Sequence, residues 1–317
     1  MGATGDREQG RPPETAEART MTLGTLYGLS AYLMWGLFPL YWKSLSTVPA
    51  TQILAHRIAW AFGFTALLAL ALRKVGALKS LLSDRKRLLS TVVAGVLVSA
   101  NWGIYIWAVN DGRIVETSLG YYLNPLVSVV LGGVALRERL DKGIRIATGA
   151  AALGVLVLAI SYGRIPWISL ALAATFATYS LVKKLAGLDA VVGMVAETAA
   201  VFPFALGFLL AKQGAGDGAF WNSGPANSLL LALAGPVTAI PLLAFAAGLK
   251  RIPLSRMGFL QYVSPTLQLF LGVVVYGEAF GAMHAIGFGT VFAALAIYLS
   301  TRKTTRRLEQ GGTEARR

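Results

Sequence analysis

Apolar residues occur along most of the chain in runs of about 20, separated by short polar segments rich in lysine and arginine. A helix of that length spans the hydrocarbon core of a bilayer and satisfies its own backbone hydrogen bonds there. The pattern therefore predicts an all-α, multi-pass integral membrane protein. Reading the runs against breaking residues gives ten transmembrane helices, at 22–42, 51–72, 88–108, 114–136, 143–161, 166–182, 191–211, 227–249, 254–276 and 281–300.

The two ends of the chain lack this pattern. Residues 1–21 are polar, of mixed charge and contain Pro12-Pro13, so we expect a disordered cytoplasmic tail. Residues 301–317 form a basic cytoplasmic tail. The first apolar run is of span length and continues into Trp42-Lys43 without a small-residue cleavage site. We therefore expect a retained first helix rather than a secretory signal.

The basic residues indicate the orientation. If the N-terminus lies in the cytoplasm, most of the 29 lysines and arginines fall in cytoplasmic segments. Such a bias is typical of the inner side of a membrane. We expect a protein of the cytoplasmic membrane (the plasma or inner membrane) with both termini in the cytoplasm. The net charge of +14 then comes from short loops, which excludes nucleic acid as a partner.

The composition of the chain excludes several classes of protein and of functional site. Only 14% of residues are charged, against about 25% in soluble proteins, and 55% are hydrophobic. The absence of cysteine excludes disulfides and thiol catalysis, and two histidines do not form a His-rich metal site, so we expect no metal and no cofactor. The sequence also lacks a phosphate-binding loop, a His-Glu-x-x-His motif and a Gly-x-Ser-x-Gly motif, so we expect neither an ATPase nor an intramembrane enzyme.

An internal repeat relates the two halves of the chain. Residues 122–138 and 262–278 share Tyr, Pro, Leu, Gly, Val and Glu at a constant spacing of 140 positions, and a weaker echo 141 positions apart aligns His56 with Glu197. Five spans separate the equivalent segments, so the halves have opposite orientations in the membrane. This arrangement predicts inverted repeats at 22–161 and 162–300. It is typical of secondary transporters that alternate access to one site.

Charged side chains inside the spans are candidate gates, because a charge in hydrocarbon usually faces a cavity or a partner. One hypothesis pairs Arg57 with Glu116 to close the outer side and Glu197 with Arg256 to close the inner side. The alternative is that Arg57 extends outward, Arg256 is a positive-inside anchor and Glu116 reaches interfacial water.

A second hypothesis assigns proton coupling to Glu197 and His56. Desolvation favours protonation of a carboxylate, and histidine titrates near neutral pH. The alternative is a neutral, hydrogen-bonded structural pair.

Polar and aromatic residues within the spans are candidates for a substrate cavity or for helix packing: Asn101, Trp102, Tyr121, Tyr122, Asn124, Gln261 and Tyr262. Pro125, Pro265 and Pro241 are candidate helix hinges, because proline leaves a backbone carbonyl without its partner. Trp42, Trp107, Trp167 and Trp221 lie near span ends, which predicts an interfacial belt.

Several of these motifs are similar to those of one family. They are Ala55-His56-Arg57, Asn101-Trp102, residues 106–110 and 116–121, Asn124-Pro125-Leu126, Glu197-Thr198, residues 258–262 and Tyr276-Gly277-Glu278. Over residues 24–300 the chain resembles the RarD proteins of the EamA group of the drug/metabolite transporter superfamily. The resemblance implies ten helices, duplicated EamA halves and a permease of the cytoplasmic membrane. The family name alludes to chloramphenicol sensitivity.

We therefore expect a secondary transporter, either a permease or an exporter, that moves a small organic metabolite or drug by alternating access. Two other classes stay open. A lipid-linked carrier or flippase on the same fold would have a cavity open to lipid. A non-transporting membrane scaffold is less compatible with loops this short. The sequence does not distinguish a monomer from a homodimer.

Overall fold

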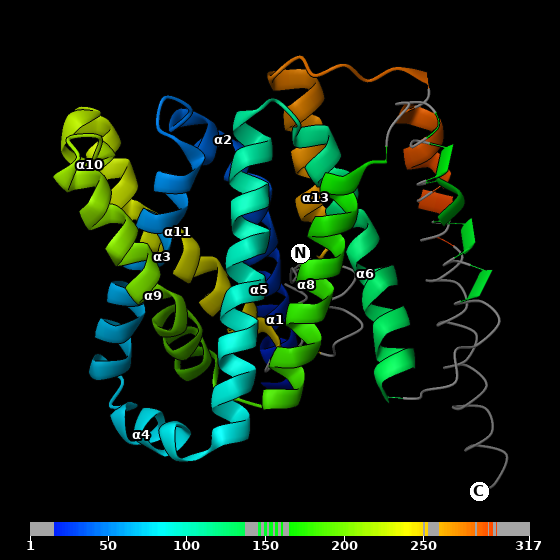
Figure 1. Cartoon of the computed structure of the whole chain (residues 1–317). Coiled ribbons are helices and arrows are strands. Elements are labelled where there is room, and N and C mark those ends of the chain that lie inside the picture. Colours follow the sequence, from blue (N-terminus) through cyan, green and yellow to red (C-terminus); the bar gives the residue numbers. More distant parts are fainter. Residues whose placement is uncertain are drawn as a thin grey trace, which may run out of the picture.

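The computed structural model describes residues 16–136, 165–249, 251–252, 260–282 and 284–290, with isolated positions within 145–160 and 292–296. Throughout this part of the chain the regular elements are helices, and none is a strand. Figure 1 shows the long helices packed side by side. Their bounds are α1 Ala16–Gly36, α2 Phe38–Ser44, α3 Ala50–Ala71, α4 Val75–Ser83, α5 Arg85–Asn110, α6 Ile114–Leu136, α8 Trp167–Ala186, α9 Ala190–Gly214, α10 Ala219–Asn222, α11 Pro225–Leu249, α13 Val263–Phe270 and a π-helix Leu271–Val275.

The long helices fall on the apolar runs of the sequence. Four of them, α3, α5, α9 and α11, are long and apolar enough to cross a membrane. Their outer faces carry large apolar side chains such as Leu67, Phe204 and Leu210, which are 68%, 79% and 62% exposed. Apolar surface on this scale is expected where lipid rather than water is the solvent. Within the predicted span 143–161 the described residues are isolated positions, and nine of its 19 residues lie outside the described part.

Two short helices, α4 and α10, occupy segments predicted as loops. Figure 1 shows them at opposite ends of the bundle. In α4 only Leu81 is buried, whereas its neighbour Leu82 is 69% exposed. Each helix is too short to span a membrane, so the 20-residue apolar pattern could not reveal either of them.

The first predicted span is not continuous, because the helix breaks at Leu37 between α1 and α2. Pro39 follows the break and has no N–H to donate to the carbonyl of Trp35, four residues earlier. That carbonyl instead accepts a hydrogen bond of 3.1 Å from Nε2 of Gln268 in α13. The break is thus held by a side chain from the second half of the chain.

The ninth predicted span, 254–276, is also modified. Residues 253–259 lie outside the described part, α13 begins at Val263, and five π-helical residues follow it. Gly277 then turns the chain with a φ of 65°. The carboxylate of Glu278 accepts hydrogen bonds from the backbone N–H groups of Ile114 (2.7 Å) and Val115 (2.8 Å). Glu278 therefore caps the N-terminus of α6, where N–H groups lack helical partners.

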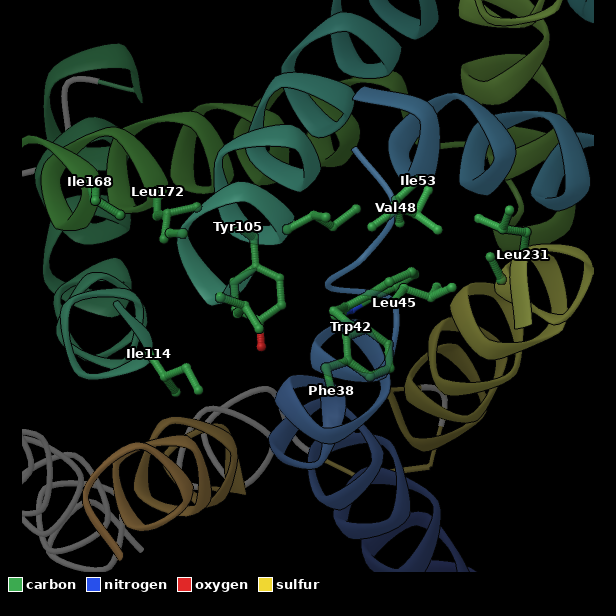
Figure 2. Close-up of a cluster of buried hydrophobic side chains, with 14 of the residues drawn as sticks. Phe38, Trp42, Leu45, Val48, Ile53, Tyr105, Ile114, Ile168, Leu172 and Leu231 are labelled. Atoms are coloured by element: carbon green, nitrogen blue, oxygen red, sulfur yellow. The ribbon is translucent and has the colours of Figure 1, made fainter. Parts of the chain in front are cut away.

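The largest buried cluster joins α2, α3, α5, α6, α8, α10 and α11. Figure 2 shows Phe38 and Trp42 from α2 beside Tyr105 from α5, with Ile53 and Leu231 on the other side of Trp42. Trp42 is fully buried, so its prediction as an interfacial residue is wrong. It is buried because it belongs to one cluster with side chains of α3, α5 and α11. Trp107, Trp167 and Trp221 are 37%, 46% and 72% exposed.

Two glycines allow helices to approach closely. A Cβ atom at Gly95 of α5 would overlap the backbone carbonyl of Glu197 in α9. A Cβ atom at Gly235 of α11 would overlap the carbonyl of Trp60 in α3. Small residues permit such contacts between membrane helices, and both contacts involve backbone, which cannot rotate away.

Candidate functional site

The guanidinium of Arg57 lies inside a cage of aromatic rings. Arg57 comes from α3 and is 3% exposed. Its guanidinium carbon lies 4.1 Å from the ring centroid of Trp102, 4.7 Å from that of Trp42 and 5.7 Å from that of Phe38. Arginine stacks favourably on aromatic faces, and such contacts gain strength when water is excluded.

Phenol and amide groups extend this site. Tyr41, Tyr105 and Tyr121 all interact electrostatically with Arg57. The hydroxyl of Tyr121 donates to Oδ1 of Asn101 at 3.3 Å. Asn101 Nδ2 in turn donates to the carbonyl of Leu172 (3.1 Å) and to the hydroxyl of Thr175 (2.9 Å). The structure therefore brings together four residues singled out from the sequence: Arg57, Asn101, Trp102 and Tyr121.

Tyr122 and Tyr262 belong to a different cluster. Their rings stack with centroids 6.2 Å apart, and Phe292 packs edge-on against Tyr122 at 4.9 Å. The hydroxyls of Tyr122 and Thr266 are 2.5 Å apart. Consecutive helical residues are rotated by about 100°, so Tyr121 and Tyr122 project from different faces of α6. Two further candidates lie near this region: Asn124 is buried, and Gln261 is half-buried in the turn before α13.

At the predicted outer end, Glu116 pairs with another arginine. Its Oε2 lies 3.9 Å from Nη1 of Arg113, and Nε of Arg113 lies 2.6 Å from Asp111. Among the described residues, no ion pair joins Arg57 to an acid in this conformation. A gate formed by Arg57 and Glu116 stays a prediction, and it would require a different arrangement of α3 and α6.

At the other predicted gate, Glu197 is buried and held by two donors. Nζ of Lys183 lies 2.9 and 3.1 Å from its two carboxylate oxygens, and the hydroxyl of Tyr179 donates to Oε2 at 3.0 Å. Lys183 also donates to the Tyr179 hydroxyl at 2.8 Å. Arg256, the partner predicted from the sequence, lies outside the described residues.

Sequence reasoning missed Lys183 and Tyr179 as site residues. Lys183 was assigned to a cytoplasmic segment because it follows an apolar run. The signal that could have identified it is its spacing from Tyr179, because residues four apart lie on the same face of a helix. Both face α9 there and can reach one carboxylate.

The remaining candidates are dispersed. His56 is buried and its ring stacks on Phe220 with centroids 5.4 Å apart. Pro241 lies inside α11 together with Pro236, and Pro125 lies within α6. The carbonyl of Pro265 accepts a hydrogen bond of 2.7 Å from the hydroxyl of Ser118. Hinge roles for these prolines stay predictions. No group of three metal-ligating side chains occurs within the described ranges.

A bundle of apolar helices with a buried arginine and with a buried glutamate paired to a lysine is typical of membrane transporters, where intramembrane charges serve solute or ion pathways. The comparisons with known proteins agree with that class. The model of the EamA-like transporter family matches residues 22–160. The RarD protein of Streptomyces exfoliatus is 45% identical over 92% of this chain and 93% of its own length.

An uncharacterized transporter of Bacillus subtilis, YojE, is 45% identical over 87% of this chain and 93% of its own length. The chain belongs to the EamA-like transporter family and is a membrane transporter of the RarD type, as the sequence motifs predicted. One solved crystal structure has a similar fold, with a TM-score of 0.55 and 24% identity over 86% of this chain and 96% of the other.

Proposed function

We propose that this protein is a secondary transporter that moves a small organic solute across the cytoplasmic membrane by alternating access. In this proposal ten helices form two inverted repeats, at 22–161 and 162–300, and both termini lie in the cytoplasm. The transported solute binds between the repeats, and charged pairs on the two sides open in turn.

The packing of the helices supports the inverted repeats. If the repeat relates α1 to α8, α3 to α9 and α5 to α11, two of the contacts between the halves have a counterpart under the repeat. Helix α1 packs on α11 as α8 packs on α5, and α3 packs on α11 as α9 packs on α5. Figure 1 shows α5 and α8 side by side. The pairing follows the 140-residue spacing found in the sequence.

The glycine contacts support the same relation. Gly95 and Gly235 are 140 positions apart, and a backbone carbonyl of the partner helix packs closely against each of them. The carbonyls belong to Glu197 in α9 and Trp60 in α3, which are equivalent helices under the repeat. Two matching close approaches are what a two-fold related pair of crossings requires.

The observation that carries the inner gate is the buried carboxylate of Glu197 bonded by both Lys183 and Tyr179. Burying an ion pair costs desolvation free energy that its attraction barely offsets, so such a pair is weak evidence of a purely stabilising role. This pair bridges α8 and α9 at the predicted cytoplasmic end. Separation of α8 from α9 breaks it, and its re-formation closes that side.

Proton coupling is the second part of the proposal. Lys183 and Tyr179 stabilise the charged carboxylate while the gate is closed. When the gate opens, Glu197 loses both donors and becomes accessible to protons from the cytoplasm. The carboxylate would then carry a proton in one direction as the solute moves in the other. His56 is retained as a second candidate proton carrier, because it occupies the equivalent position in the other half.

The test is uptake into proteoliposomes of the purified protein, with a panel of radiolabelled metabolites that includes chloramphenicol. We expect saturable uptake driven by an imposed pH gradient. Glu197→Gln should lower gradient-driven uptake at least tenfold while exchange without a gradient continues, because the neutral side chain cannot carry a proton. Asp217→Asn, an exposed acid in the loop before α10, is the matched control.

Three results separate the parts of the proposal. Uptake that ignores the pH gradient would keep the transporter and remove proton coupling. Equal loss of uptake and exchange in Glu197→Gln would reduce Glu197 to a gate residue. No uptake of any compound by protein that is folded and correctly inserted would contradict the transporter itself.

A further inference from the structure

Three buried hydrogen-bond donors around Arg57 have no acceptor. Nε and Nη1 of Arg57 and Nε1 of Trp42 are fully shielded and make no hydrogen bond with any described residue. The hydroxyl of Tyr105 is likewise buried and without a partner. Arg57 is 3% exposed, Trp42 0% and Tyr105 2%, so neither water nor lipid headgroups reach them from outside in this conformation.

The unpartnered groups are near one another. The Arg57 guanidinium lies over the ring of Trp42 at 4.7 Å, and Tyr105 interacts with it electrostatically. Figure 2 shows Tyr105 projecting from α5 into the same cluster as Trp42 and Phe38. Buried donors in folded proteins are nearly always paired, so a local group of unpaired ones requires an explanation.

The chemistry of these groups defines what would satisfy them. Arginine and tryptophan nitrogens donate only, and a tyrosine hydroxyl can also donate. The site therefore lacks acceptors. It also contains a cation without an acidic counterion, and the aromatic rings offset only part of the cost of burying that charge. A negatively charged group with several acceptor oxygens would satisfy both needs.

The charge at the site favours a monoanion. Arg57 is the single cation of the described residues that contacts this cage, and its electrostatic neighbours are phenols. A carboxylate carries one negative charge and matches the planar fork of a guanidinium with two parallel hydrogen bonds. A phosphate dianion would need a second cation. The surrounding rings of Trp102, Trp42 and Phe38 suit a flat, apolar body attached to the carboxylate.

We propose that Arg57 binds the carboxylate of an aromatic or otherwise planar organic monoanion, with Trp42 and Tyr105 as additional donors. The inference rests on the proposed transport function and identifies the class of its solute. In the absence of solute, the aromatic cage holds the guanidinium in place so that its donors are already oriented. Neutral analogues of the same shape would leave these donors unsatisfied and would bind less tightly.

The test compares acids with their amides on the full-length protein in lipid nanodiscs at pH 7, using isothermal titration calorimetry. The probes are phenylacetate with phenylacetamide and indole-3-acetate with indole-3-acetamide, and acetate tests the role of the ring. We expect each aromatic acid to bind roughly 10- to 100-fold more tightly than its amide. Acetate should bind more weakly than either aromatic acid.

Variants assign the preference to the site. Arg57→Gln should remove the preference for acid over amide, and Tyr105→Phe should reduce it severalfold while every ring is retained. Arg113→Gln, which changes an arginine outside the cage, should leave it intact. If Arg57→Gln does not fold, as judged by gel filtration, Tyr105→Phe decides the question.

Equal binding of acid and amide, or a preference that survives in both Arg57→Gln and Tyr105→Phe, would overturn the proposal. So would the absence of binding by any acid at millimolar concentration to folded protein. The same aromatic acids are then used in proteoliposome counterflow. Arg57-dependent binding without counterflow would support the anion site and contradict transport, so the two failures are distinguishable.

Discussion

Buried polar side chains in this protein are mostly satisfied within small groups. Asn101 bonds to Leu172, Thr175 and Tyr121, and Glu197 bonds to Lys183 and Tyr179. Each group connects two or three helices, so each hydrogen bond also fixes a relative position of helices. Arg57 differs because its Nε and Nη1 make no hydrogen bond with any described residue while rings surround it. That difference is what separates a binding group from a structural one.

Asp189 shows how one side chain joins three segments. It caps α9, since its Oδ1 accepts from the N–H groups of Val191 (3.0 Å) and Val192 (3.3 Å). It also lies 2.6 Å from Nζ of Lys74 at the start of α4. Partial burial raises the pKa of Asp189, but the hydrogen bonds from Lys74 and from the backbone outweigh it and hold the pKa below its ordinary value.

Asp189→Ala should therefore destabilise the protein in a pH-dependent way. A carboxyl whose pKa is lower when folded stabilises the protein above its unfolded pKa of about 3.9, and this stabilisation is lost as pH falls through the folded value. We expect a loss of about 1 kcal/mol at pH 7, the usual cost of removing a cap, and this loss should shrink as the pH falls below about 4. Thermal unfolding in detergent across this range measures it.

Asp217→Ala is the control, because the Asp217 side chain is 66% exposed and its pair with Lys212 is 3.5 Å long. An exposed pair of this kind contributes at most about 1 kcal/mol. A pH-independent loss in Asp189→Ala would show that only the neutral capping geometry matters.

At the scale of elements, the close approach of two helices depends on glycines at the points where the helices cross. At Gly95 and at Gly235, a backbone carbonyl of the neighbouring helix lies where the Cβ atom of any other residue would be. Gly63 of α3 and Gly207 of α9 have no heavy atom within 4 Å of that position. The same residue type therefore has different roles in neighbouring helices.

Gly95→Ala and Gly235→Ala should each destabilise the protein by about 1–3 kcal/mol, because the added methyl group forces two helices apart. Gly63→Ala and Gly207→Ala should leave stability unchanged or slightly higher, since alanine favours helix more than glycine does. The melting temperature in detergent measures all four. Similar melting temperatures for both pairs would mean that the crossings adjust freely.

The apolar pattern predicted the helices well where polar residues or breakers mark both ends. Helix α3, Ala50–Ala71, lies within one residue of the predicted span 51–72 at each end. Interruptions inside an apolar run were not predictable, because the break at Leu37 and the π-helix at 271–275 preserve hydrophobicity. The proline at 39 was the only local sign of the first interruption, and sequence does not show which group then bonds the freed carbonyl.

The residues of the candidate site could be predicted only in part. Intramembrane charge and polarity identified Arg57, Asn101 and Tyr121, which the structure brings together. Depth along a helix can be counted from sequence, but rotation about the axis and the choice of partner depend on packing. The sequence therefore predicts a cytoplasmic loop for Lys183 and a membrane interface for Trp42. In the structure Lys183 pairs with a buried carboxylate and Trp42 is fully buried.

At the scale of the whole molecule, the ends of the bundle can be assigned to the two sides of the membrane. Helix α4 follows the basic Arg73-Lys74 and lies at the opposite end from α10 (Figure 1). The positive-inside rule then predicts that α4 lies in the cytoplasm and α10 outside. The chain has no cysteine, so a single introduced thiol reports one position without background.

Ser80→Cys in α4 and Ala215→Cys after α9 are both exposed positions. In intact cells a membrane-impermeant maleimide should label Ala215→Cys and not Ser80→Cys, and inside-out vesicles should give the reverse. Labelling is read from the shift in gel mobility. Equal labelling of both positions from one side would contradict the proposed topology.

The hydrogen bond from Gln268 to the carbonyl of Trp35 has a mechanical consequence. It attaches α13 at the point where α1 ends and α2 begins, and α2 carries Phe38 and Trp42 to Arg57. A small displacement of α13 would therefore move only the seven-residue helix α2 and not a whole membrane-spanning helix. Under our proposal, binding of a solute to Arg57 in the first half would therefore shift α2 and, through Gln268, the helix α13 of the second half.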